Sequence, residues 1–278
     1  MPLTLDKLIG AYKQVLPLTK TTVLTTVAGI PFTLFDRAGI PAAGSLNPGN
    51  TTTGIVPVDT DATGYPVLDN PLGTDKLYLS RVAINGSVAM SLDLYDVLFM
   101  AGQTTIPTSG TTTVALTSRP SFSGRVPFLA DGATRDWSRV ELFIQASSAL
   151  SNHVHTCSID YLDQDGNAGN TGNVSTQQIT VNRWIRCPLA AGDRGVQEIT
   201  GYNVNGVASA TGNVSVLAAR RLGSFRTQGG LSSLYGPDYT GLPELYGNSA
   251  IVMVCRSDST SSGTPDVLIE VAHMDPNA

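Results

Sequence analysis

The residues best suited to chemistry are two histidines and a cysteine that lie close together. His153, His155 and Cys157 occupy alternate positions in the stretch HVHTCSIDYL. Alternate side chains of a β-strand point to the same face, so a strand here would bring both imidazoles and the thiol together. Histidine and cysteine are common zinc ligands, and a fourth ligand could come from a neighbouring strand or subunit. The simpler interpretation is a polar outer strand face with Cys157 as a small buried hydrophobic residue, and we expect no metal or other cofactor.

Three aspartates just downstream suggest a second cation site. Asp160, Asp163 and Asp165 alternate before Gly166 in IDYLDQDGNAGN, as carboxylates do in calcium-binding loops. The spacing does not fit, because counting back from Gly166 as the sixth position puts Tyr161 where the first acidic ligand is required. No glutamate occupies the twelfth position. The stretch is better explained as a hairpin tip with an Asp-Gly turn.

Motifs of known catalytic machinery are missing from the sequence. It contains no phosphate-binding GxxxxGK loop, no HExxH, no GxSxG and no paired CxxC. Only three histidines are present, so few bases exist for a Ser-His or Cys-His pair. We therefore expect a protein that is not an enzyme. A hydrolase on a β scaffold is the alternative, but the sequence offers no preferred pair of carboxylates for it.

The bulk composition narrows the class of protein. Charged residues make up only 14% of the 278 residues, and Thr, Ser, Gly and Asn are abundant, which favours short strands and turns over long helices. A net charge of −5 argues against nucleic acid as a partner. Three widely spaced cysteines argue against a disulfide framework. With no apolar signal or membrane-spanning run, we expect cytoplasmic synthesis, no membrane partner and release only by lysis.

The basic residues form two groups. Arg220 and Arg221, with Arg226 nearby, are the denser group, and strand alternation would send Arg220 and Arg221 to opposite faces. In both groups we expect the arginines to be solvated or to form inter-subunit salt bridges rather than to bind phosphate. The looser group consists of Arg119, Arg125, Arg135 and Arg139.

Helical spacing of apolar residues predicts one helix, over residues 4–16. Thr4 could cap its start and Pro17 could end it, so residues 1–18 form an N-terminal helical arm. The apolar face of this helix must pack on its own domain or on a neighbouring subunit. The residues that we take from it as candidate subunit contacts are Leu5, Leu8, Ile9 and Tyr12.

The remainder, residues 19–278, is predicted to form one or two β domains. About ten segments with period-two alternation and short spacing indicate an antiparallel β-sandwich or jelly roll with one short N-terminal helix. Three pairs of segments are expected to be hairpins: 77–86 with 88–100, 153–162 with 175–189, and 195–206 with 213–225. Residues 38–75, rich in Pro, Gly, Thr and Asp, are expected to form a long surface excursion that could wrap a neighbour.

Several phrases of the sequence resemble the virion structural proteins of tailed bacteriophages. The similarity lies in the general residue pattern of these phrases and in their order along the chain. It implies a β-rich particle component that assembles in many copies and has no active site to transfer. The commonest major capsid fold of these phages would need a long helix, and no long helix follows residue 16. The phrases lie between residues 77 and 273 and are YLDQDGNAGN, LAAGDRGVQEITGYNV, TGNVSVLAARRLGSF, SLDLYDVLFMAGQTTIPTSGTTTVALTSRP and LPELYGNSAIVMVCRS.

The resemblance therefore implies a capsid decoration, cement or auxiliary head protein located in the virion. Its expected partners are other copies of itself and other virion proteins, above all the major capsid protein. Tyr235, Tyr239 and Tyr246 in LYGPDYTGLPELYG add an aromatic loop of the kind that anchors interfaces, although the same loop could simply pack on the core. The competing function is a carbohydrate-binding or host-surface module of the tail, with sugars stacked on loop tips.

Overall fold

The chain folds mainly into antiparallel β-strands, as the sequence predicts. Two short α-helices lie in the described part of the chain, α1 (Leu5–Gly10) and α2 (Pro237–Thr240), and none there is long or apolar enough to cross a membrane. Two 3-10 turns, Ser123–Arg125 and Trp137–Arg139, precede β8. The computed structural model describes residues 5–21, 23–46, 50–61, 63–151, 153–176 and 183–275.

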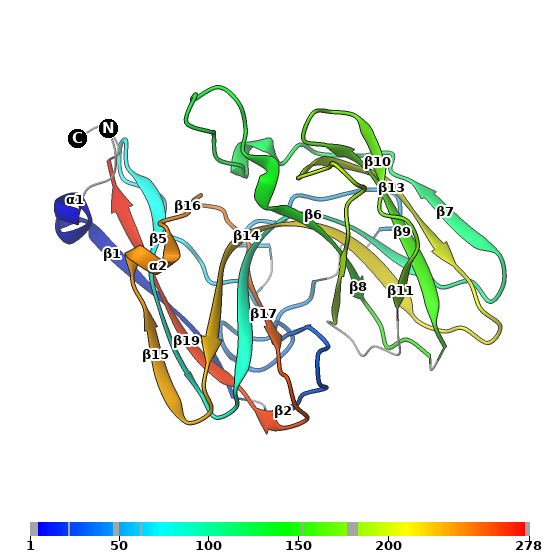
Figure 1. Ribbon diagram of the computed structural model, residues 1–278, viewed down its shortest axis with the longest axis horizontal. Coiled ribbons are helices and arrows are strands. Elements are labelled where there is room, and N and C mark those ends of the chain that lie inside the picture. Colours follow the sequence, from blue (N-terminus) through cyan, green and yellow to red (C-terminus); the bar gives the residue numbers. More distant parts are fainter. Residues whose placement is uncertain are drawn as a thin grey trace.

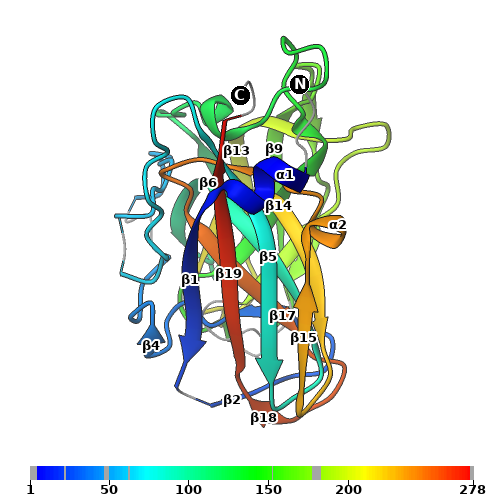
Figure 2. The same ribbon diagram turned by 90° about the vertical axis from the view of Figure 1, so that its left-hand side faces the viewer.

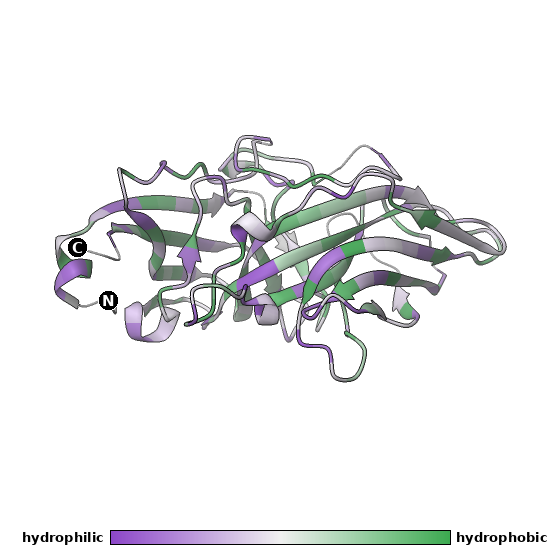
Figure 3. Ribbon diagram, turned by 90° about the horizontal axis from the view of Figure 1, so that it is seen from above, coloured by the Kyte–Doolittle hydropathy of each residue, from purple (hydrophilic) through white to green (hydrophobic). Residues whose placement is uncertain are grey.

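A long central sheet runs through the whole molecule. Its two longest strands, β6 and β14, pair over almost their full length (Figure 1). Hydrophobic residues are concentrated in the strands (Figure 3), as expected where a sheet is buried. The strand order is β12 (Trp184–Cys187), β8 (Val140–Ala146), β14 (Asn213–Thr227), β6 (Met90–Thr105), β17 (Ile251–Arg256) and β3 (Phe32–Thr33).

Two further sheets lie on either side of these long strands (Figure 1). The terminal sheet consists of β15 (Leu231–Tyr235), β5 (Lys76–Gly86), β19 (Pro265–Met274), β1 (Tyr12–Lys20) and β4 (Gly39–Ile40), with β16 (Glu244–Leu245) beside β5. The distal sheet consists of β10 (Ala168–Asn170), β9 (His155–Asp163), β13 (Val196–Asn205) and β7 (Thr111–Ala115), with β11 (Val174–Thr176) beside β9. A small pair joins β18 (Ser262–Gly263) to β2 (Leu24–Thr25).

Each outer sheet forms a separate hydrophobic core with the central sheet. Ala218 of β14 belongs to the core shared with the distal sheet, whereas Leu222 belongs to the core shared with the terminal sheet. Arg220 lies between them on the same face of the strand. The molecule is thus two β-sandwiches that share the long strands β6 and β14, with a charged residue at the junction of their cores.

The excursion over residues 38–75 packs on its own central sheet. Phe35, Leu46 and Tyr65 form a third core cluster with Leu217 and other residues from the opposite face of the central strands. A bridge between Ile55 and Met100 anchors the middle of the excursion. This segment therefore covers a sheet of its own chain.

The predicted helix over residues 4–16 is wrong beyond Gly10. The helix ends there, and β1 begins at Tyr12 and pairs with β19. Leu16 and Leu18 are buried by this pairing, which overrides the helical spacing of the apolar residues. Pro17 fits because β4 reaches only Thr19 and Lys20, so β1 is an edge at Pro17.

The predicted hairpins are only partly correct. Strand β11 returns along β9 as expected, but β12 pairs with β8 instead. The segments predicted to pair as β5 with β6, and as β13 with β14, are strands that lie in different sheets. Alternation of apolar residues reveals a half-buried strand but does not reveal its partner, and at both places the chain crosses from one sheet of a sandwich to the other.

Candidate functional site

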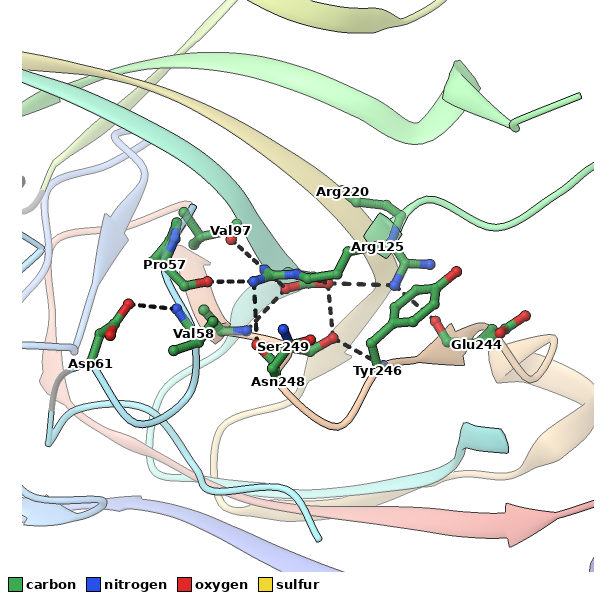
Figure 4. Close-up of polar contacts among 12 residues, drawn as sticks. Pro57, Val58, Asp61, Val97, Arg125, Arg220, Glu244, Tyr246, Asn248 and Ser249 are labelled. Atoms are coloured by element: carbon green, nitrogen blue, oxygen red, sulfur yellow. Dashed lines mark hydrogen bonds and ion pairs between the residues drawn. The ribbon is translucent and has the colours of Figure 1, made fainter. Parts of the chain in front are cut away.

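A buried charge cluster fills the junction between the two cores (Figure 4). The Asp96 side chain is completely buried, and the guanidinium groups of Arg125 and Arg220 both face it. Arg125 Nη2 donates to Asp96 Oδ1, and Arg220 Nη2 lies 3.6 Å from Oδ2. The Ser249 hydroxyl and the Ala250 amide donate to the same carboxylate at 2.9 and 3.0 Å. One carboxylate therefore holds two buried cations.

The two arginines connect this cluster to distant parts of the chain. Arg125 donates to the carbonyls of Pro57 in the 38–75 excursion, of Val97 in β6 and of Asn248 before β17. Arg220 donates to the Glu244 carbonyl at 2.8 Å. Because every Asp96 oxygen already accepts hydrogen bonds, we assign the cluster a structural role rather than acid–base chemistry.

Tyr246 closes one side of the cluster. Its ring centroid lies 5.5 Å from the Arg220 guanidinium carbon, a cation–π distance. Burial raises the pKa of the Tyr246 phenol to about 12, with the negative charge of Glu244 as a second cause. Burial also lowers the pKa of Arg220, and Asp96 opposes that shift. Tyr246, a predicted subunit contact, therefore packs within its own chain.

The outward face of the terminal sheet carries an apolar row across four strands. Pairing places Leu234, Ala83, Leu268 and Pro17 side by side on β15, β5, β19 and β1. These four strands lie next to one another in Figure 2. Leu234 is 65% exposed and Leu268 is 47% exposed, and both line a shallow depression of about 400 Å³. We call these four residues the apolar row.

Charges of opposite sign flank the apolar row at equal distances. On one side of the row, Arg81 and Glu270 lie two residues along their strands from Ala83 and Leu268. Arg81 is exposed and forms an ion pair with Glu270 at 2.6 Å, and Lys13 lies 3.8 Å from the same carboxylate. Two residues in the other direction, Asp266 lies exposed opposite Asn85. One flank therefore carries two cations and one carboxylate, and the other carries a single carboxylate.

The candidate contacts from the N-terminal segment divide between the inside and the outside. Leu8 is buried against Tyr78 and Met274 of its own chain. Ile9 is 68% exposed and Tyr12 is 56% exposed, so these two remain available to a partner. The side chain of Leu5 lies outside the described residues.

The remaining aromatic candidates form a small cluster near α2. The ring centroids of Tyr235 and Tyr239 are 4.6 Å apart, and both rings contact Phe225. Tyr235 is half-buried on the core, whereas Tyr239 is exposed. Only Tyr239 of the three predicted tyrosines therefore presents most of its side chain to a partner.

The histidine and cysteine candidates do not converge on a metal site. His155 and Cys157 both point into the interior of the distal sheet, but His153 precedes the strand and is exposed. Burial raises the pKa of the Cys157 thiol to about 12, which disfavours the thiolate that binds zinc. Among the described residues, no group of three potential ligands is close enough to hold a metal ion.

The aspartate-rich stretch forms a turn, in agreement with the hairpin interpretation. Asp163 accepts hydrogen bonds from the amides of Asp165 and Asn167, both at 2.8 Å. Gly166 has a φ of 82°, which a glycine adopts without strain. The carboxylate of Asp163 is thus used to shape the tip.

Sequence reasoning missed the buried charge cluster. Arg220 and Arg125 were expected to be solvated or to bridge subunits, and both are buried inside the chain. The expectation that Arg220 and Arg221 point to opposite faces is confirmed, since Arg221 is exposed. A signal for Arg220 existed in LAARRLG, where it alternates with Ala218 and Leu222 and therefore shares their buried face.

Comparison with known proteins returns weak similarities to structures of icosahedral virus particles. No protein-family model matches the chain, and no curated protein matches it in sequence. A chain of the infectious bursal disease virus Gt strain is 14% identical, with 96% of this chain and 82% of that chain covered, at a TM-score of 0.17.

Two other solved structures give a similar result. The VP2 subviral particle of infectious bursal disease virus is 11% identical, with 98% and 83% covered and a TM-score of 0.19. Sulfolobus Turreted Icosahedral Virus gives 10% identity, 92% and 98% coverage and a TM-score of 0.13. TM-scores of this size do not establish a shared fold.

Proposed function

We propose that this protein is a structural subunit of a virus particle that assembles in many copies, and that one contact between copies is the outward face of its terminal sheet. The apolar row is the observation that carries this proposal. Leu234 and Leu268 place two large, exposed apolar side chains on one sheet face. Covering such a face with a partner removes apolar surface from water, at about 25 cal/mol per Å².

The flanking charges favour a second copy of the same chain as the partner. Two copies can pack face to face about a two-fold axis that runs along the apolar row. This axis reverses the strand direction, so the flank with Arg81, Lys13 and Glu270, which carries one net positive charge, lies over the flank of the other copy that carries Asp266. The low charged fraction of 14% also suits extensive burial between subunits, because few charges lose water.

The sequence resemblance supports a finer version of the proposal. In that version the protein is a decoration, cement or auxiliary head protein of a tailed bacteriophage, and it stabilises the shell by contacts with itself and with the major capsid protein. Ile9 and Tyr12, which are exposed, are the candidate contacts for these additional interfaces.

Light scattering tests the proposal. The mass of the purified protein is measured over a concentration series, alone and with particles that lack the protein. Discrete oligomers, or saturable addition to the particles, are the expected results. A protein that stays monomeric at all concentrations and ignores the particles would exclude the structural role and favour the carbohydrate-binding alternative.

A further inference from the structure

A second surface feature lies on the same face of the central sheet as the 38–75 excursion, on the part of that face that the excursion leaves open. It is a groove of about 380 Å³. Four arginines line it: one comes from β12, two come from β14 and one comes from β17. Tyr95 and Glu141 lie in it as buried residues. We call it the arginine groove, and its arginines are Arg186, Arg221, Arg226 and Arg256.

Two of these arginines lie on either side of Ser91 without a counter-ion among the described residues. Arg226 and Arg256 pair with the two sides of Ser91, so only the width of β6 separates them. Adjacent strands are about 4.8 Å apart, which places the two backbones about 10 Å apart. Both side chains are exposed, and neither forms an ion pair with any residue in the described part of the chain.

The other two arginines share a single carboxylate. Arg186 Nη2 lies 3.0 Å from Glu141 Oε1, and Arg221 Nε lies 3.7 Å from the same atom. The second oxygen, Glu141 Oε2, accepts from the Tyr95 hydroxyl at 2.9 Å. Asp93, the other acidic residue of the groove, accepts from the Ser224 hydroxyl. The groove therefore has an excess of positive charge in a chain whose net charge is −5.

An exposed aromatic ring lies at the same place. Tyr239 lines the groove and is 59% exposed, and its hydroxyl donates to the Ser224 carbonyl at 3.1 Å. Contacts with Tyr235 and Phe225 hold the ring in place. A fixed, exposed ring is a surface on which the apolar face of a sugar can stack.

The arginines, carboxylates and tyrosine ring of the groove together favour one class of anion over others. Guanidinium groups bind carboxylates and phosphates in a bidentate way. A dense polyphosphate would meet the carboxylates of Asp93 and Glu141 between the arginines, whereas sugar hydroxyls can donate to Asp93 and to Ser91. We infer that the arginine groove binds a carboxylated glycan, with its carboxylates on Arg226 and Arg256 and one sugar ring on Tyr239. This inference is independent of the proposed assembly through the terminal sheet.

Calorimetric titration with a galacturonic acid hexamer tests the inference. The wild-type protein is expected to bind this probe, and the affinity is expected to fall as salt rises. The double variant Arg226→Gln/Arg256→Gln should lose roughly tenfold or more in affinity, because two charge-assisted contacts are removed. Tyr239→Ala should also weaken binding. Arg119→Gln removes an exposed arginine bound to Glu198 outside the groove and should retain wild-type affinity.

Three parallel titrations can overturn the inference. Their probes are a neutral galactose oligomer, polyglutamate and inorganic polyphosphate. If polyglutamate or polyphosphate binds at least as strongly as the hexamer, the groove is a general anion site instead of a glycan site. Equal binding of the neutral oligomer would show that the arginines are not used. A wild-type protein that ignores the hexamer at millimolar concentration would exclude the site. Unchanged thermal unfolding of the double variant shows that it is folded.

Discussion

Asp96 on β6 and Arg220 on β14 are directly paired across the two strands, and their side chains meet where the hydrophobic cores of the two sandwiches adjoin. A charged pair in this position costs desolvation free energy, which Arg125 and the hydrogen bonds from Ser249 and Ala250 offset. Arg220 also joins β16 to the shared strands through the Glu244 carbonyl, and Arg125 joins the 38–75 excursion to them through the Pro57 carbonyl. The buried charge cluster therefore links both sandwiches and the excursion at one point.

Removal of the shared carboxylate should destabilise the whole chain. Asp96→Asn leaves two buried guanidinium groups without a counter-ion, and we expect it to lower the free energy of unfolding by about 3 to 5 kcal/mol. Urea unfolding followed by tryptophan fluorescence measures this change. Asp93→Asn on the outward face of the same strand is the matched control and should cost less than about 1 kcal/mol. Equal losses in the two variants would contradict the role of the junction.

The 38–75 excursion should depend on a close approach to the central sheet. A Cβ at Gly54 would overlap the Phe99 ring, so Gly54→Ala must displace one of them. We expect a loss of about 1 to 3 kcal/mol in the free energy of unfolding and faster hydrogen exchange at the amide of Ile55. Gly124→Ala, where a Cβ would meet open space, should change neither quantity. Unchanged exchange in Gly54→Ala would mean that the excursion is not held on the sheet.

The two parts of the N-terminal segment should differ sharply in their effect on folding. Deletion of residues 1–10 removes α1 and the burial of Leu8, and we expect a loss of about 2 to 3 kcal/mol with the fold retained. Deletion of residues 1–17 also removes most of β1 and uncovers Ile269 and its neighbours, and we expect no cooperative unfolding transition. Circular dichroism during heating distinguishes the two. A folded 1–17 deletion would contradict the placement of β1 in the sheet.

Buried His155 should make the stability depend on pH. Burial, followed by the charge of His153, lowers the pKa of His155 below its usual 6.5, so the unfolded chain binds the proton more readily. This stabilisation is complete above about pH 6.5 and is lost as the pH falls from there through the folded-state pKa. Urea unfolding at several pH values should give a flatter dependence for His155→Gln. His153→Gln should keep most of the wild-type slope, because burial is the larger cause.

Most strands could be predicted from the sequence, because alternation of apolar and polar residues is a local property. The segments 139–147, 250–257 and 265–275 match β8, β17 and β19 within about two residues. Sheet membership could not be predicted, since β5 and β6 are consecutive in the sequence but lie in different sheets. The N-terminal helix was overextended because Tyr12, Val15 and Leu16 satisfy a helical period as well as a strand pattern.

The candidate surfaces were less accessible to sequence reasoning. The apolar row joins residues 17, 83, 234 and 268, which only the strand register brings together. The arginine groove likewise brings together arginines from three separate strands. The zinc hypothesis assumed that His153, His155 and Cys157 all lie on one strand and share one face. This holds for His155 and Cys157 but not for His153, which lies before the strand.

The most direct test of assembly through the terminal sheet is the solution mass of Leu268→Asp beside that of Leu129→Asp. The two leucines are 47% and 46% exposed, but Leu129 lies outside the apolar row. Because an aspartate buried between two copies is strongly unfavourable, multi-angle light scattering should show oligomers for the wild-type protein and Leu129→Asp and a monomer for Leu268→Asp. A Leu268→Asp protein with the wild-type oligomeric mass would contradict the proposed interface.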